Sequence, residues 1–355
     1  MKKFAKYIFL FLLPLIVIML PFFIGDPFKI LHHYDRYYPE DGQPLYLNIN
    51  RSYVSTRMYL QYKDSFLYNS FIFGSSRSEH FLVKDWKQYL PDSASCFHFD
   101  GYSDPLYSIH KKLMFLDKQH APIDNVIICF DAENLAKSSP IENDHLRALP
   151  PLLDYSWSTS EMFYKTHLNV YFEPHFYVSY IDFLLHRQIK PYMTEWGIWD
   201  IKPSYYILRY NEREEKLADD TYPESHYSPN LLAAFESAQS EKGIPYDHIL
   251  NAVSISMLQE IADVFEKHHT DYKIVLSPMY DQRPLSAIDV TTLEQIFEER
   301  IYNFTGENIW NSDYHNYNDP AHFSDRVAAK MMQIIYEPDS VRQQQMLDSI
   351  YNLPE

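Results

Sequence analysis

Two short segments, far apart in the chain, carry residue types that together could perform nucleophilic acyl chemistry. The first reads GSSR at positions 74–77 and follows a short apolar stretch, and the second reads DPAH at positions 319–322. A serine becomes a nucleophile when an imidazole removes its proton, and that imidazole needs a partner to fix its tautomer. An aspartate three residues before a histidine can be that partner. The two segments therefore predict Ser76 as nucleophile, His322 as base and Asp319 as orienting carboxylate.

Each segment alone also has a simpler explanation. A serine that follows a strand often only caps the next helix, and an Asp-x-x-His sequence is common by chance. The side chains of Asp313, His315, Asp319 and His322 are also types that bind zinc or manganese. No matching His or Asp pair follows the first strand, so we expect neither a metal nor another cofactor.

The elements around the two segments alternate between strands and helices. The apolar run NVIICF at Asn125–Phe130 is typical of a parallel strand that is covered on both faces. The pattern predicts strands at 71–73, 95–99, 125–130, 272–277 and 308–310, and helices at 106–119, 247–268, 291–302 and 324–336. Such alternation predicts a doubly wound α/β fold with a flavodoxin-like parallel sheet in the strand order 2-1-3-4-5. Ligands bind at the carboxyl edge of such sheets, so both segments should meet there.

Taken together and in this order, the GSS and DPAH segments resemble the blocks of the SGNH (GDSL-like) hydrolase superfamily. The resemblance implies that Ser76, Asp319 and His322 form a catalytic triad that works through a covalent acyl-serine. It also implies that the backbone N–H of Gly101, after the second strand, joins that of Ser76 in an oxyanion hole.

The third block of the superfamily, GxND, is where this chain departs from the pattern. Positions 130–134 read FDAEN, so Asp131 replaces the glycine, and Asn134, displaced by one position, is a candidate oxyanion donor. The resemblance covers residues 66–135 and 245–337. Similar departures occur in membrane-tethered relatives such as the D-alanyl transfer protein of teichoic acid synthesis and the alginate O-acetylation proteins. This likeness implies an acylated envelope polysaccharide as substrate and a membrane-bound acyltransferase as a partner.

The N-terminus contains an uncharged run from residue 7 to residue 25, preceded by Lys2, Lys3 and Lys6. Its length suits a single-pass membrane anchor, and the lysines predict a cytoplasmic N-terminus with the bulk of the chain outside. A cleaved signal peptide is the alternative, but the run is long for one and lacks a small-x-small cleavage site.

Composition excludes several other classes of protein. The chain of 355 residues has 31 Lys and Arg against 48 Asp and Glu, a net charge of −17, which argues against nucleic-acid binding. The chain has only seven glycines, and neither a dinucleotide fingerprint nor a P-loop is present.

Cys96 and Cys129 should lie on the two strands that flank the first one, about 9 to 10 Å apart, too far for a disulfide. Arg77 either binds an anionic group of the substrate or faces solvent.

The chain is expected to form one α/β domain with a long interruption. Positions 151–210 hold 16 aromatic residues, which could form a sugar-stacking surface, a membrane-facing lid or simply a packed core. An SGNH-type esterase or O-acyltransferase is one functional prediction, and an inactive envelope protein that binds a partner is the other. The expected parts are an anchor at 1–25, a membrane-proximal neck at 26–65, the α/β domain at 66–139 and 246–337, the insertion at 140–245 and a tail at 338–355.

Overall fold

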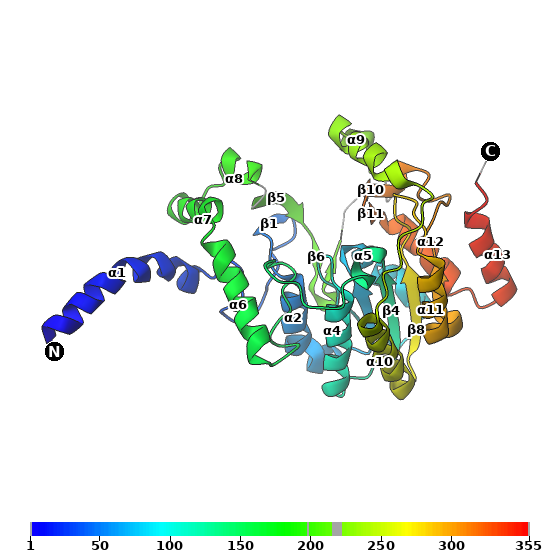
Figure 1. Cartoon of the computed structure of the whole chain (residues 1–355), viewed down its shortest axis with the longest axis horizontal. Coiled ribbons are helices and arrows are strands. Elements are labelled where there is room, and N and C mark those ends of the chain that lie inside the picture. The colour runs from blue at the N-terminus through cyan, green and yellow to red at the C-terminus, as the bar shows by residue number, and fades with distance from the viewer. Residues whose placement is uncertain (1, 197–198, 215–221, 354–355) are drawn as a thin grey trace.

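Five parallel strands form the central sheet of the computed structural model, which describes residues 2–196, 199–214 and 222–353 (Figure 1). The strand order is β3-β2-β4-β8-β9, and every neighbouring pair is parallel, so the predicted 2-1-3-4-5 order is confirmed for the first four predicted strands. The strands are β2 (Ser70–Gly74), β3 (Cys96–His98), β4 (Asn125–Phe130), β8 (Asp271–Leu276) and β9 (Ile301–Asn303).

The last strand of the sheet differs from the prediction. Helix α11 (Ala287–Phe297) begins and ends earlier than expected, and the remaining residues of the predicted helix form a 3₁₀ helix, η7 (Glu298–Arg300), and the start of β9. Residues 308–310, the predicted strand, form a turn instead, in which the Asn308 side chain accepts a hydrogen bond from the Trp310 backbone N–H at 3.0 Å. The prediction was wrong because a strand of three residues at a sheet edge is too short to carry an apolar run that would mark it.

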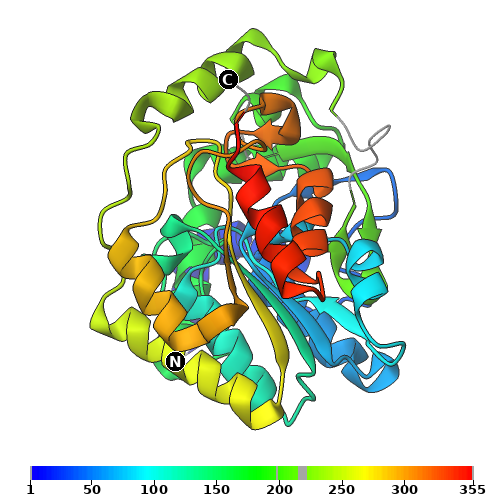
Figure 2. The ribbon, with the colours of Figure 1, turned by 90° about the vertical axis from the view of Figure 1, so that its right-hand side faces the viewer.

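Helices cover both faces of the sheet, and successive strand residues alternate between two cores. On β4, Val126 and Ile128 pack into one core, whereas Ile127 and Cys129 pack into the other. The first core is covered by α4 (Leu106–Lys118), α10 (Ala252–His268) and α11, and the second by α3 (Val83–Trp86), α12 (Asp325–Ile335) and α13 (Ser340–Ile350). Figure 2 shows α12 and α13 on one side of the sheet and α10 and α11 on the other. This double burial explains the apolar run of β4 after Asn125.

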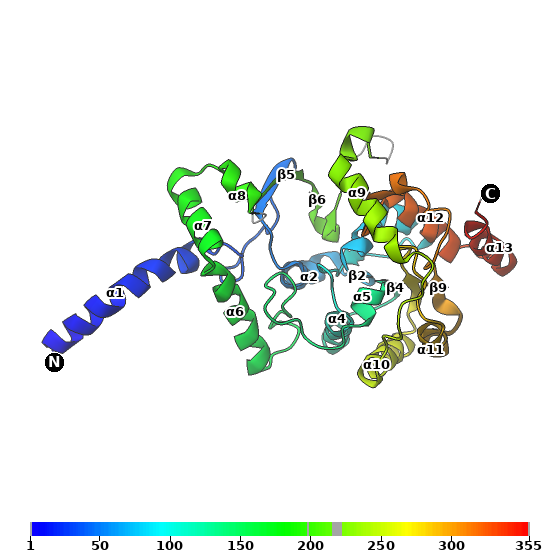
Figure 3. The ribbon, with the colours of Figure 1, turned by 45° about the horizontal axis from the view of Figure 1, so that its top comes forward.

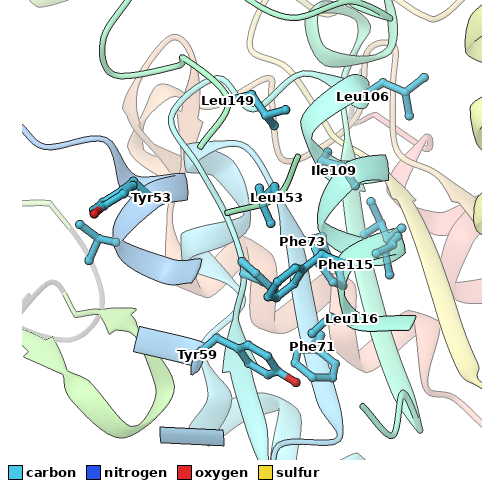
Figure 4. Packing of buried hydrophobic residues seen from close by; sticks show 14 of the residues in the cluster. Tyr53, Tyr59, Phe71, Phe73, Leu106, Ile109, Phe115, Leu116, Leu149 and Leu153 are labelled. Carbon is cyan, nitrogen blue, oxygen red and sulfur yellow. The ribbon is translucent and has the colours of Figure 1, made fainter. Parts of the chain in front are cut away.

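Two segments that were predicted to lie outside the α/β domain contribute helices to it. Helix α2 (Arg51–Phe66), from the predicted neck, packs Tyr59 against Phe71 and Phe115 with ring centroids 6.1 and 6.0 Å apart (Figure 4). The predicted tail forms α13, whose Ile350 is buried in the second core.

The insertion forms helices and the strands of two small two-stranded sheets beside the central one. Its elements are α6 (Trp157–Tyr171), α7 (Pro174–His186), α8 (Pro191–Glu195), β5 (Trp199–Ser204), β6 (Tyr206–Ile207), β7 (Glu212–Arg213) and α9 (Pro229–Ala238). Strand β5 pairs antiparallel with β1 (Gln43–Leu47), which joins the insertion to the N-terminal part of the chain. Phe163, Tyr171 and Phe176 are buried, so packing accounts for a part of its aromatic content.

Helix α1 (Lys2–Gly25) projects from the rest of the molecule, as Figures 1 and 3 show. Its last turns pack against the insertion, where the ring centroids of Phe22 and Tyr171 lie 5.1 Å apart. Within the parts of the chain that the structure describes, no helix has both the length and the apolar character needed to cross a membrane.

Candidate active site

The turn after β2 presents Ser76 at the carboxyl edge of the sheet. Gly74 ends the strand with φ +146°, a conformation that side chains rarely adopt. A Cβ atom there would lie 2.7 Å from the Cys129 carbonyl oxygen and 2.9 Å from Cβ of Ser78. Only glycine therefore allows β2 to turn sharply into the short 3₁₀ helix η1 (Ser76–His80), whose first residue is the predicted nucleophile.

The three predicted triad residues meet at this edge. The Ser76 hydroxyl lies 2.7 Å from Nε2 of His322, although 246 positions separate the two residues. Nδ1 of His322 lies 2.9 Å from both carboxylate oxygens of Asp319. Asp319 and His322 face each other across a hairpin formed by β10 (Tyr317–Asp319) and β11 (His322–Phe323). The predicted convergence of these side chains is confirmed.

The surroundings of Asp319 keep it ionised. Partial burial opposes its charge, but the hydrogen bond and charge of His322 and the backbone N–H groups of Ala321 and His322 outweigh this. The pKa of Asp319 is therefore below its ordinary value. A carboxylate on Nδ1 makes that nitrogen the protonated one, so Nε2 can accept the proton of Ser76.

The triad opens into a pocket of about 580 Å³ at the edge of the sheet. The rest of its lining is polar, and Asp200 on β5, the neighbouring Lys202 and Arg213 on β7 come from the insertion. No motif in the sequence indicated these three residues, because Asp200 and Lys202 reach the pocket through the pairing of β5 with β1, and Arg213 through the pairing of β7 with β6. The other lining residues are Asn48, Glu79, His80, Tyr102, Asn318 and Asp325.

Arg77 is placed differently from the prediction. Its side chain is buried, forms an ion pair with Asp131 after β4, and donates from Nε to the Ala321 carbonyl at 2.8 Å. It also donates to the Ser75 hydroxyl at 3.2 Å. The prediction that Arg77 binds an anionic substrate group or faces solvent is corrected, because its guanidinium ties η1 to the turn that carries His322.

The two predicted oxyanion donors are also engaged elsewhere. Asn134 and Asp131 cap the short helix α5 (Ala132–Leu135) reciprocally, and the Asn134 amide group donates to the Asp131 carboxylate at 3.1 Å. The backbone N–H of Gly101 donates to the Gly74 carbonyl at 3.2 Å. Both groups therefore have partners within the protein, and their roles as oxyanion donors, like that of the backbone N–H of Ser76, stay predictions.

A buried charge network, which sequence reasoning missed, supports the floor of the pocket. Arg51 of α2 donates from Nε to Asp100 at 2.9 Å, and its Nη1 lies 3.4 Å from a carboxylate oxygen of Glu79. Burial opposes the charge of Arg51, but the two carboxylates hold its pKa well above the ordinary value. The network fixes α2, the loop after β3 and η1 to one another. In the sequence, only the position of Asp100 directly after a predicted strand could have indicated this network.

The alternative metal cluster does not assemble. His315 lies 2.6 Å from Asp313 and 3.0 Å from Glu224, whereas Asp319 and His322 face Ser76. In the described ranges, no three His, Cys, Asp or Glu side chains are grouped so that they could hold a metal ion.

The two cysteines lie in the cores rather than at the site. Cys96 on β3 and Cys129 on β4 flank β2, are both unpaired, and are buried. Burial raises the pKa of each thiol to about 12, so neither is a reactive thiolate near neutral pH.

Comparison of the sequence with protein-family models and with curated proteins finds no match.

Proposed function

We propose that the protein is an SGNH-type serine esterase or O-acyltransferase that acts through an acyl-Ser76 intermediate. The observation that carries this proposal is the hydrogen-bonded series from Ser76 through His322 to Asp319, open to a polar pocket. Such a series is how a neutral hydroxyl becomes a nucleophile at neutral pH.

The geometry supports a two-step acyl transfer. His322 accepts the Ser76 proton while Oγ attacks the ester carbonyl, and the tetrahedral intermediate collapses as His322 returns that proton to the departing alcohol. In the second step His322 takes a proton from water or from a sugar hydroxyl, which attacks the acyl-serine and releases Ser76. Asp319 stabilises the imidazolium in both steps. Water as acceptor makes the protein an esterase, and a sugar hydroxyl makes it an acyltransferase.

The pocket lining favours a polar, hydroxyl-rich substrate such as an exported or envelope polysaccharide. Side chains that can hydrogen-bond line it, and the cations Lys202 and Arg213 are accompanied by the carboxylates of Glu79, Asp200 and Asp325. Because the pocket is not basic overall, an uncharged polymer suits it better than an anionic one. As an O-acyltransferase the protein would need a source of acyl groups, and a membrane-bound acyltransferase is the partner that would supply them.

The N-terminal helix supports attachment to a membrane, with the catalytic part outside the cytoplasm. Phe11, Val17 and Ile24 of α1 expose most of their surface, and the rest of the chain does not cover them. We expect the protein to stay in the membrane fraction after a carbonate wash. Recovery of a mature form that begins near Asp26 would show instead that the segment is a cleaved signal peptide.

A second candidate function is an inactive envelope protein that binds a partner. The engagement of the Gly101 N–H and of the Asn134 amide within the protein favours it, because an oxyanion without donors is poorly stabilised.

Labelling with a fluorophosphonate probe separates the two candidates. The wild-type protein in detergent should be labelled, and Ser76→Ala should not be. Ser158→Ala is a matched control, because Ser158 is an exposed serine of α6 outside the pocket. Absence of labelling in the wild type, or equal labelling of Ser76→Ala, would exclude the proposed enzyme.

A further inference from the structure

A second histidine–carboxylate pair lies in the same pocket as the triad. Nδ1 of His80 is 2.7 Å from a carboxylate oxygen of Asp325, and the two side chains are only 10% and 11% exposed. Both residues line the pocket together with Ser76 and His322. The ring centroids of His80 and His322 are 6.4 Å apart, close enough for one small substrate to contact both rings.

The two pairs come from the same two segments of the chain. Helix η1 begins with Ser76 and ends with His80, and α12 begins at Asp325, three residues after His322. Asp325 stands at the first position of an 11-residue helix, where the backbone N–H groups favour a negative charge. The packing of η1 against the segment that contains His322 and Asp325 therefore positions both pairs, Ser76 with His322 and His80 with Asp325.

The contact with Asp325 favours one tautomer of the His80 ring. A carboxylate on Nδ1 favours the tautomer with a proton there, and Nε2 is then the nitrogen on the other side of the ring. A neutral imidazole accepts a hydrogen bond from a hydroxyl at Nε2, and an imidazolium donates one to an oxygen. Both forms suit an alcohol oxygen.

Acyl transfer through Ser76 places an alcohol oxygen in the pocket, first as the leaving group of the ester and, in a transferase, later as the attacking hydroxyl. His322 exchanges a proton with that oxygen but does not hold the rest of the alcohol. We propose that His80, oriented by Asp325, is a second substrate-contacting residue, which binds the alcohol portion of the ester or of the acyl acceptor. This inference rests on the proposed function and adds to it a residue that selects alcohols.

The competing explanation is that the pair only braces η1 against α12. Two esters with different leaving groups distinguish the explanations. The phenolate of p-nitrophenyl acetate leaves with little assistance, whereas the sugar alkoxide of glucose pentaacetate requires hydrogen bonding and a proton. If His80 binds the alcohol, His80→Gln should lower kcat/KM for glucose pentaacetate about tenfold more than for p-nitrophenyl acetate. Asp325→Asn should show a smaller difference of the same sign.

His110→Gln is a matched control. His110 lies 2.7 Å from Glu260 and is also 10% exposed, but it joins α4 to α10 away from the pocket. It should change kcat/KM for the two esters equally or not at all, and thermal unfolding verifies that each variant is folded. An equal loss on both esters in His80→Gln and Asp325→Asn shows bracing and overturns this inference alone. Absence of Ser76-dependent turnover of p-nitrophenyl acetate in the wild type overturns the proposed function and this inference with it.

Discussion

Arg77 is expected to position the catalytic turn rather than to bind substrate, and Arg77→Met tests this directly. The guanidinium pairs with Asp131 and donates to the carbonyl of Ala321, the residue before His322. Methionine keeps the length and the apolar part of the side chain but removes both interactions. The variant should therefore lose stability and activity for two separable reasons.

The loss of stability follows from the carboxylate that is left behind. The side chain of Asp131 is 3% exposed, and removing one partner of a buried ion pair typically costs about 3 to 5 kcal/mol. In the double variant Arg77→Met/Asp131→Asn no buried charge remains, and asparagine caps α5 as well as aspartate does. The double variant should therefore be more stable than Arg77→Met, with a coupling energy of about 2 kcal/mol between the two positions.

The loss of activity should not recover in the double variant. Both variants lack the hydrogen bond to Ala321, and a displacement of about 1 Å at a catalytic group can cost about 10²-fold in rate. Fluorophosphonate labelling rates should therefore fall by about that factor in both variants. Urea unfolding in detergent gives the stabilities, and Arg342→Met, which removes an exposed arginine paired with Glu337, serves as control.

Labelling at the wild-type rate in Arg77→Met would refute this reasoning. A loss confined to KM for anionic esters would instead support the original prediction that Arg77 binds substrate.

Two further predictions concern ionisable groups. Asp319→Asn should lower kcat about 10³-fold at pH 7 without a comparable change in KM. The reason is that an amide does not keep the His322 ring in the tautomer that is protonated at Nδ1. Steady-state kinetics with p-nitrophenyl acetate measure both constants. His167, which is fully buried on α6, has a pKa lowered by burial to about 3. Between about pH 6.5 and pH 3, His167 is therefore protonated in the unfolded chain but neutral in the folded protein. The free energy of unfolding falls as the pH drops through this range. Lowering the pH from 8 to 5 should cost about 2 kcal/mol through this group, and His167→Phe should remove that loss in urea titrations. An unchanged pH dependence in His167→Phe would contradict the buried neutral histidine.

The parts of the fold that the sequence predicted well are those with a strong local signal. Strand β4 was predicted with its observed bounds because the five consecutive apolar residues that follow Asn125 are typical of a strand covered on both faces. The Ser76, His322 and Asp319 contacts were predictable because the topology of a parallel sheet brings both segments to one edge. Strand β9, three residues at the edge, carries no such signal, and its neighbour α11 was extended over it.

The roles of Arg77 and Asn134 depended on tertiary contacts that no local pattern encodes. Asp131 stands where the SGNH pattern has glycine, and it forms an ion pair with Arg77 and a reciprocal cap with Asn134. From their positions in the motif, Arg77 and Asn134 were predicted to contact the substrate. Their contacts in the structure indicate instead that both support the turn that carries Ser76.

In the proposed enzyme, chemistry and substrate selection come from different parts of the chain. The triad lies at the edge of the parallel sheet, in turns fixed by Gly74 and Arg77, so its geometry follows from the sheet. Lys202 and Arg213 come from the insertion, which reaches the pocket through strands that are not part of that sheet. Substitution of Lys202 should therefore alter which esters are accepted more than how fast Ser76 reacts with a small probe, whereas substitution of Arg213, which lies 3.9 Å from Glu79 of η1, should affect both.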